Sequence, residues 1–187
     1  MVKKKACVFI SGSGTNLRSI INNSRDYNFP INICLVVSNN KKAKGIIYAK
    51  KFSIPHMSLS ANKYDFEKTV IRILNEKKIK LICLAGFMKI LSKKFIREFK
   101  GEIINIHPSL LPMYKGLNTF QRVLKSKEKF TGCTVHFVDE KLDNGKIIIK
   151  KRIIIDKNDN VDTLKKKVQF QEYKAYSCAI RKIFSSG

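Results

Sequence analysis

The stretch "CVFISGSGTNL" (residues 7–17) joins an apolar run to a glycine-rich turn and the start of a helical pattern. We expect a strand over Ala6–Ile10, a sharp turn at Gly12–Gly14 and a helix over Asn16–Asn23. Backbone N–H groups at such a helix start suit a phosphate. An ordinary strand–helix turn gives the same pattern, so both interpretations stay open. Leu17 stands where the dinucleotide fingerprint needs its third glycine, which disfavours dinucleotide binding.

Apolar runs and helical patterns alternate in the same way along the rest of the chain. It predicts further strands at Ile31–Val37, Leu81–Ala85, Ile103–His107, Cys133–Val138 and Ile147–Ile155. It predicts further helices at Ala43–Phe52, Tyr64–Glu76, Lys93–Phe99 with Ser92 as N-cap, and from near Asp162 to about Phe184. Because the first four strands are almost continuously apolar, we expect them to be parallel and covered on both faces. The fold class predicted is α/β: a single-domain, doubly wound, mostly parallel sheet with antiparallel strands in the C-terminal part and a C-terminal helix.

The composition favours a soluble, cytoplasmic protein with a basic surface. The chain has 38 Lys and Arg against 14 Asp and Glu, a net charge of +24, and the basic residues are spread in small groups. We expect a solvated surface that attracts anionic small molecules, with nucleic-acid binding as the alternative. No apolar run approaches the roughly 20 residues of a membrane span. The five cysteines lack a Cys-x-x-Cys pair, so we expect reduced, buried thiols and neither disulfides nor a metal site.

The stretch "INIHP" (residues 104–108) places two polar side chains at the end of a predicted buried strand. Residues two apart in a strand face the same way, so Asn105 and His107 project together. Parallel strands present their carboxyl ends to the ligand crevice, and Pro108 ends this strand at once. The pair is a candidate for catalysis. The alternative is a core histidine satisfied by a backbone carbonyl, with Asn105 capping a loop.

Two carboxylates are further candidates. We expect Asp143 in a turn where Asn144-Gly145 supplies the residues with positive φ. Next to a histidine it would orient the ring and raise its pKa, although Asp before Gly is also ordinary turn chemistry. Glu172 falls on the inward stripe of the last predicted helix, where a carboxylate needs a partner or a ligand. The alternative is a surface position at the edge of that stripe.

The other two histidines, His56 and His136, have no evident carboxylate or metal partner in the sequence. His56 follows a proline, and we place it in a loop. His136 lies in an alternating strand pattern, and we expect it to be structural.

Taken together, these motifs resemble phosphoribosylglycinamide formyltransferase, of the folate-dependent formyltransferase family. The matching residues are "ISGSGTNL" (10–17), "VVSN" (36–39), "LAGFMKIL" (84–91), "INIHPSLLP" (104–112), "KG" (115–116), "GCTVHFV" (132–138), "LDNG" (142–145) and "VQFQE" (168–172). They follow the family's order and cover nearly the whole chain. The resemblance implies a Rossmann-like formyltransferase domain over residues 1–187, with a phosphate-binding half over about 1–100 and a catalytic and folate-binding half over about 101–187.

The resemblance also implies roles for individual residues. Gly14, Thr15 and Asn16 would bind the substrate phosphate, and Glu172 the ribose hydroxyls. The folate pocket would be lined by Met88, Lys89, Ile90, Leu91 and Asn105. Asn105, His107 and Asp143 would be catalytic, with a protonated His107 stabilising an oxyanion.

The implied reaction transfers the formyl group of formyltetrahydrofolate, a co-substrate, to the glycyl amine of glycinamide ribonucleotide in purine synthesis. The amine attacks directly through a tetrahedral intermediate, without a metal. The implied partners are these small molecules, with no specific nucleic acid and no membrane, for a monomer or weak homodimer. Lys89 stands where the family usually has Arg, and Lys63 is the candidate replacement for a second Arg that grips the folate tail.

Overall fold

The computed structural model describes residues 2–59 and 62–184, which form a seven-stranded sheet and six helices within that part of the chain. The strands are β1 (Lys4–Ile10), β2 (Ile31–Ser38), β3 (His56–Ser58), β4 (Leu81–Leu84), β5 (Glu102–His107), β6 (Phe130–Phe137) and β7 (Ile147–Ile154). The helices are α1 (Thr15–Ser24), α2 (Ile46–Lys51), α3 (Lys63–Glu76), α4 (Lys93–Glu98), α5 (Thr119–Lys125) and α6 (Val161–Phe184). The strand order is β3-β2-β1-β4-β5-β6-β7. The chain divides into two compact units, residues 1–104 and 105–187, and the boundary falls inside β5.

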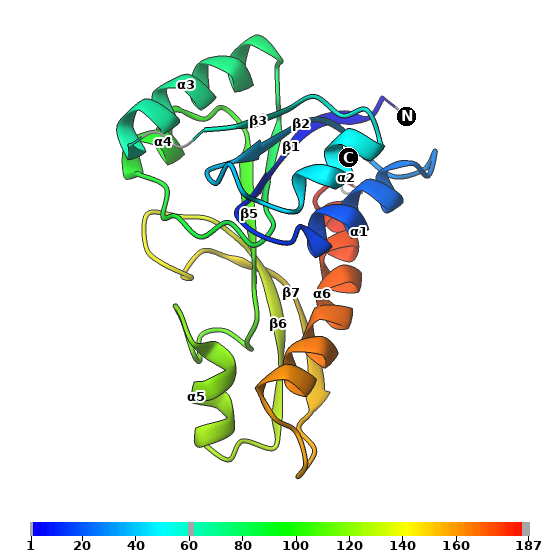
Figure 1. Cartoon of the computed structure of the whole chain (residues 1–187), viewed down its shortest axis with the longest axis vertical. Coiled ribbons are helices and arrows are strands. Elements are labelled where there is room, and N and C mark those ends of the chain that lie inside the picture. Colours follow the sequence, from blue (N-terminus) through cyan, green and yellow to red (C-terminus); the bar gives the residue numbers. More distant parts are fainter. Residues whose placement is uncertain (1, 60–61, 185–187) are drawn as a thin grey trace. The chain divides into compact units, whose positions relative to one another are not determined.

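The first unit is built on parallel strands with helical crossovers, as Figure 1 shows in blue to green. β1 is its central strand and pairs in parallel with β2 and with β4, while β3 pairs in parallel with β2. Residues Ala6–Ile10 of β1 are fully buried, as expected for a strand covered on both faces. Two helix starts are fixed by side-chain caps: Asn62 accepts from Asp65 N–H, and Ser92 accepts from Phe95 N–H.

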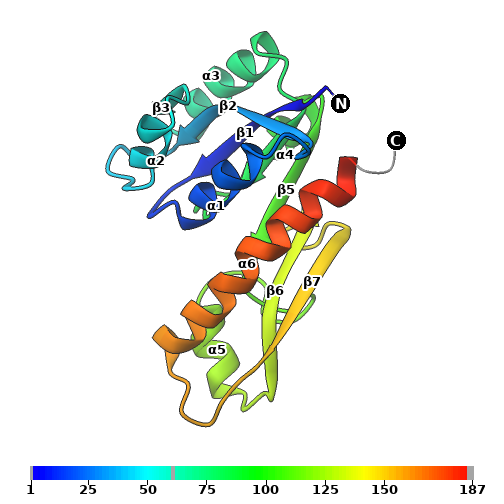
Figure 2. The ribbon, with the colours of Figure 1, turned by 90° about the vertical axis from the view of Figure 1, so that its right-hand side faces the viewer.

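The second unit pairs β6 and β7 as antiparallel neighbours. Figure 2 shows α6 running alongside both strands. The inward stripe of α6 is buried, and Glu172 lies on it together with the apolar residues Leu164, Val168, Ala175 and Ala179. Burial of this stripe against the two strands supplies the apolar contact that holds the helix.

The predicted fold class is confirmed, including the parallel first strands, the antiparallel pair and the last helix. Two short elements, β3 of three residues and α5 of seven residues, were not predicted. Because β3 contains His56, the prediction that this residue lies in a loop is wrong. The expected burial of all thiols is also wrong, because Cys178 is exposed and Cys34 only partly buried. In the described parts of the chain, no helix has the length and apolarity to cross a bilayer.

Candidate active site

The glycine-rich turn of the first unit is held by a close backbone contact with the start of α2. Gly14 adopts a left-handed conformation (φ 71°) and is the N-cap of α1. A Cβ atom on Gly14 would lie 2.5 Å from Cα of Gly45, and the N–H of Gly45 donates to the carbonyl of Gly12 at 2.9 Å. Only glycine allows both the positive φ and the close approach. Gly45, which supports the turn from 31 residues further along the chain, was not among the predicted site residues.

The start of α1 is suited to an anion. Among the described side chains none caps this helix end, and its first turn holds no acidic residue. Thr15 begins the helix and Asn16 is buried, with 7% of its surface exposed. The first turn of α1 therefore places no carboxylate at the positive end of the helix dipole.

Ser11 links this turn to the loop that follows β4. Its hydroxyl donates to Asn39 Oδ1 at 2.6 Å and accepts from the N–H of Met88 at 2.8 Å. The N–H of Ser11 donates to the carbonyl of Gly86 at 3.1 Å. The loops after β1, β2 and β4 are thus tied at one residue, so the predicted phosphate-binding and folate-binding segments share a support.

The loop after β4 presents apolar side chains to solvent while one phenylalanine anchors it. The ring of Phe87 lies 5.3 Å from that of Phe9 and stacks on that of Phe66 at 5.9 Å. Met88 is 74% exposed and Ile90 is 63% exposed. Of the other two residues predicted to line the pocket, Lys89 is exposed and Leu91 is buried. An anchored loop with exposed apolar residues is a surface suited to a flat aromatic ligand. The side chain of Lys63 lies outside the part of the structure that is described.

In the second unit, His107 and His136 lie beside the Asp143 carboxylate, and Asn105 lies beside His136. Oδ2 of Asp143 lies 3.3 Å from Nδ1 of His107 and accepts from the N–H of Gly116 at 2.9 Å. Oδ1 lies 3.7 Å from Nε2 of His136, and that nitrogen lies 3.4 Å from Nδ2 of Asn105. The side chains of His107 and Asp143 are each only 6% exposed. The alternative of a core histidine satisfied by a backbone carbonyl describes one side of the ring, because Nε2 of the buried His107 donates to the Tyr114 carbonyl at 2.8 Å while Nδ1 faces the Asp143 carboxylate.

The backbone conformation at Asp143 differs from the expected turn. The positive φ falls on Asp143 itself, at 46°, and not on Asn144-Gly145. Gly145 is needed for a different reason, because a Cβ atom there would lie 1.9 Å from the carbonyl oxygen of Phe137. A non-glycine residue with positive φ is strained. Here the strained residue carries the buried carboxylate.

Burial and the neighbouring groups shift both titratable partners. Burial, the largest effect, lowers the pKa of His107, and this outweighs the increase caused by the Tyr114 carbonyl and the Asp143 carboxylate. The expectation of a raised histidine pKa is therefore wrong, since desolvation of the imidazolium exceeds the attraction of one carboxylate. Burial raises the pKa of Asp143, but hydrogen bonds from His136 and Gly116 and the charge of His107 together bring it below its usual value.

His136 was wrongly placed outside the site, because the sequence showed no carboxylate near it. It is 2% exposed, lies at the end of β6 and shares the Asp143 carboxylate with His107. Its Nδ1 donates to the carbonyl of Phe137 at 2.7 Å. The sequence did contain one indication of this site. Thr134 and His136 are polar residues two apart in an otherwise apolar strand, and this spacing places both side chains on one face.

Glu172 is buried on α6 with 9% of its surface exposed, so the alternative of a surface position is wrong. Burial, and after it the charge of Glu172, raises the pKa of the Cys133 thiol to about 12. Glu172 therefore lies near β6, which also carries His136.

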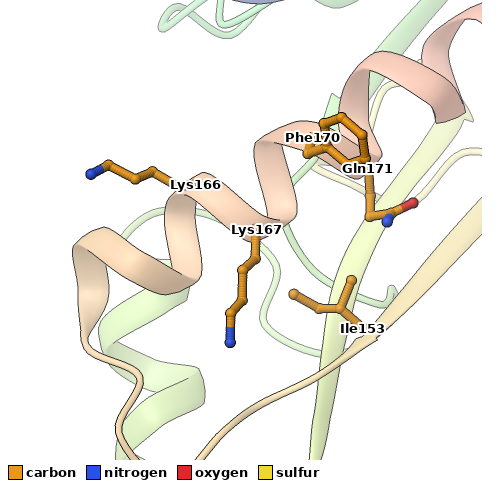
Figure 3. A pocket seen from close by; sticks show the side chains of 5 residues that line it. All are labelled: Ile153, Lys166, Lys167, Phe170 and Gln171. Carbon is orange, nitrogen blue, oxygen red and sulfur yellow. The ribbon is translucent and has the colours of Figure 1, made fainter.

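A separate hollow of about 430 Å³ is lined by residues of α6 and β7. Figure 3 shows Ile153 of β7 beside the four α6 residues that line it, namely Lys166, Lys167, Phe170 and Gln171. The Lys167 ammonium is already paired with the carboxylates of Asp156 and, at 2.7 Å, Asp159. The hollow is therefore a poor site for a further anion, and none of the predicted site residues lines it.

Comparison with known proteins identifies the class. The sequence model of the family described as formyl transferase matches residues 4–180. The chain belongs to the formyl transferase family.

Within the family, the chain is similar to phosphoribosylglycinamide formyltransferases, which confirms the resemblance inferred from its motifs. It is 39% identical to the phosphoribosylglycinamide formyltransferase of Haemophilus influenzae over 182 residues, which cover 95% of this chain and 86% of that protein. The crystal structure of phosphoribosylglycinamide formyltransferase from Bacillus halodurans superposes with a TM-score of 0.92 at 34% identity, covering 98% of this chain and 96% of that one. The chain is also 41% identical to the trifunctional purine biosynthetic protein adenosine-3 of Gallus gallus, of whose length it spans 19%.

The contact between Gly14 and Gly45 predicts a sharp difference between two glycine substitutions. Gly45→Ala forces backbone atoms apart, and we expect it to lower the free energy of unfolding by about 1–3 kcal/mol. Gly12→Ala is the matched control, because a Cβ atom there meets nothing within 4 Å, and its effect stays within about 0.5 kcal/mol. Urea unfolding of both variants measures the difference. Equal stability of the two would show that the close approach costs nothing.

The lowered pKa of Asp143 predicts a pH dependence of stability. Between the lowered folded pKa and the unfolded value of about 3.9, the unfolded chain binds the proton more readily. The contribution of Asp143 is therefore complete above the unfolded pKa and is lost as the pH falls through the folded pKa. We expect Asp143→Asn to flatten this acid limb in urea titrations between pH 6 and pH 2.5. Parallel limbs in the two proteins would contradict the shift.

Proposed function

We propose that this chain transfers the formyl group of formyltetrahydrofolate to the glycyl amine of glycinamide ribonucleotide. The observation that carries the proposal is the contact between the buried side chains of His107 and Asp143, to which His136 links Asn105, in a member of the formyl transferase family. Its similarity to phosphoribosylglycinamide formyltransferases over nearly the whole chain supports the choice of acceptor.

The ribonucleotide is held by its phosphate and its ribose. Gly14, Thr15 and Asn16 bind the phosphate through the start of α1, where backbone N–H groups and the helix dipole attract an anion. Glu172 accepts hydrogen bonds from the ribose hydroxyls. A buried carboxylate suits this role because two vicinal hydroxyls can donate to its two oxygens.

The folate is bound by the loop from Met88 to Leu91. The exposed apolar side chains of Met88 and Ile90 offer contact area to the pterin ring, and the anchoring of Phe87 keeps the loop in place. Lys89 places a cation at this loop, which complements the anionic tail of a folate. The bound folate supplies the formyl group.

Asn105 and His107 stabilise the negative charge that develops on the formyl oxygen. One N–H of the Asn105 amide faces His136, and the other donates to the oxygen. Nε2–H of His107 now donates to the Tyr114 carbonyl. The oxyanion takes the place of this carbonyl oxygen during transfer. Donors that are already oriented cost little reorganisation in the reaction.

Asp143 stabilises the proton that the attacking amine releases. When the amine attacks, a C–N bond to the glycyl nitrogen forms and that nitrogen becomes cationic. The site accepts one proton from it at Nδ1 of His107, beside the Asp143 carboxylate. A water then carries this same proton from His107 to the leaving folate nitrogen as its C–N bond breaks, and the ring returns to its neutral form. Because the pKa of His107 is lowered in the free protein, its ring starts neutral near pH 7 and is able to accept the proton.

The catalytic roles predict large losses of turnover on removal of either partner. We expect His107→Ala and Asp143→Ala each to reduce kcat for formyl transfer about 10²- to 10⁴-fold. His56→Ala is the matched control, since His56 is exposed on β3, and it should turn over like the wild type. A spectroscopic assay of folate deformylation with glycinamide ribonucleotide as acceptor measures all four proteins. An inactive wild type, or two fully active variants, would exclude the function.

The role of Glu172 predicts an effect on binding of the ribonucleotide. Glu172→Gln keeps the shape and removes the charge, and we expect KM for glycinamide ribonucleotide to rise about tenfold while KM for the folate stays constant. Gln171→Ala, one position earlier and in the hollow lined by α6 and β7, serves as control. If both KM values rise together, Glu172 acts on the fold instead of on the ribose.

A further inference from the structure

Ser11 holds the loop after β4 on both sides of Phe87. Its backbone N–H donates to the Gly86 carbonyl at 3.1 Å, and its Oγ accepts from the N–H of Met88 at 2.8 Å. Residues 85–92 form neither helix nor strand. Because no regular backbone pairing fixes this loop, individual side-chain contacts decide where Met88 and the residues after it lie.

The donor and acceptor roles at the Ser11 hydroxyl follow from its two partners. A backbone N–H can only donate, so Met88 uses a lone pair of Oγ. The hydroxyl hydrogen is then directed to Oδ1 of Asn39, 2.6 Å away. A hydroxyl that donates is also a better acceptor, because the two hydrogen bonds polarise each other. Asn39, on the loop after β2, therefore orients the hydroxyl that fixes Met88.

The other end of the loop is fixed by a carboxylate of α3. Oε1 of Glu67 accepts from the N–H of Ser92 at 2.7 Å, and Oε2 accepts from the Ser92 hydroxyl. The exposed apolar side chains of Met88 and Ile90 thus belong to a segment that is held at both ends. The Ser11 hydroxyl is the side-chain anchor at the Met88 end.

We infer that Ser11 and Asn39 are positioning residues for folate binding: the Asn39 amide orients the Ser11 hydroxyl, and this hydroxyl holds the Met88 end of the loop in the conformation that binds the pterin. The inference rests on the proposed function for the identity of the ligand. Both residues act through the backbone of Met88. A loop that is already ordered binds at a lower entropic cost, so loss of the hydroxyl weakens folate binding.

Binding of the ribonucleotide should change much less. The N–H of Ser11 donates to Gly86, and its carbonyl accepts from Nδ2 of Asn40 at 3.0 Å, so neither contact uses the hydroxyl. The phosphate turn is held by the N–H of Gly45, which donates to the Gly12 carbonyl. Because Ser11→Ala keeps all three contacts, its effect is confined to the folate.

Titration calorimetry with tetrahydrofolate, which carries no formyl group, tests the inference on the full chain. We expect Ser11→Ala and Asn39→Ala each to raise Kd about 5- to 10-fold, the effect of one lost hydrogen bond. Asn40→Ala is the control for Asn39, because its amide contacts the carbonyl of Ser11 and not the hydroxyl. Ser24→Ala is the control for Ser11, since it removes a hydroxyl that donates to the Ile21 carbonyl at the end of α1. Unchanged affinity in Ser11→Ala, or an equal loss in Asn40→Ala, would overturn the inference.

The double variant tests whether Asn39 acts through Ser11. Without the hydroxyl, Asn39 has nothing to orient, so adding Asn39→Ala to Ser11→Ala should change Kd less than about twofold. Losses that multiply would show that Asn39 reaches the folate by another route, and this result would contradict the inference.

Hydrogen exchange of the Met88 amide distinguishes positioning from a merely structural role, without any ligand. We expect this amide to exchange about tenfold faster in Ser11→Ala and to be unchanged in Ser24→Ala. In turnover, KM for formyltetrahydrofolate should rise by the same factor as Kd, while KM for glycinamide ribonucleotide stays within about twofold. A lower free energy of unfolding with unchanged exchange at Met88 would show a structural role and would refute the inference.

The two proposals fail separately. A wild type that binds tetrahydrofolate but transfers no formyl group would exclude the proposed function alone, and the affinities of the variants would still decide the inference. A wild type that does not bind tetrahydrofolate would overturn the inference itself. If Ser11→Ala does not fold, Asn39→Ala decides by the same measurements.

Discussion

The arrangement of the second unit depends on one buried anion, the Asp143 carboxylate. Its side chain is 6% exposed, and a carboxylate removed from water must be compensated by donors around it. The Gly116 N–H and the two imidazoles surround its oxygens. These groups come from β5, from the loop after it and from β6. The requirement to solvate one charge therefore fixes three segments against one another, within the second unit.

The first unit depends on a close contact between backbone segments and not on a buried charge. The turn at Gly12–Gly14 packs against the backbone at Gly45, and Ser11 joins the loops after β1, β2 and β4. A turn that offers backbone N–H groups to a ligand must be held by contacts that leave those groups unobstructed. Glycine at both sides of the contact achieves this, because neither residue carries a side chain that could cover the helix start.

The sequence predicts the fold well because its signals are local. Continuous apolar runs identified six of the seven strands of the described sheet, and helical periodicity identified five of its six helices. The missed β3 has only three residues, which is too short to show a period. Ser92 could be predicted as an N-cap because the cap interacts with a residue only three positions away.

The site could be predicted only where its signals were equally local. Asn105 and His107 stand out together because they lie two apart on one strand. His136 does not, because its partner Asn105 is 31 residues away in sequence. The lowered pKa of His107 was also beyond sequence reasoning, since it depends on how deeply the ring is buried. The positive φ of Asp143 conflicts with the local preference for glycine, and such conflicts concentrate at functional sites.

The lowered pKa of His107 and the neighbouring carboxylate act in opposite directions, and the balance has a chemical use. A ring held permanently as imidazolium by Asp143 could donate to an oxyanion but could not accept the proton that the attacking amine must lose. In the proposed reaction, burial offsets the attraction of the carboxylate, so the ring starts neutral near pH 7 and gains affinity for a proton as negative charge develops on the formyl oxygen. Under this proposal, desolvation converts a fixed ion pair into a group whose protonation follows the reaction, and Asp143 provides the stabilisation when the proton arrives.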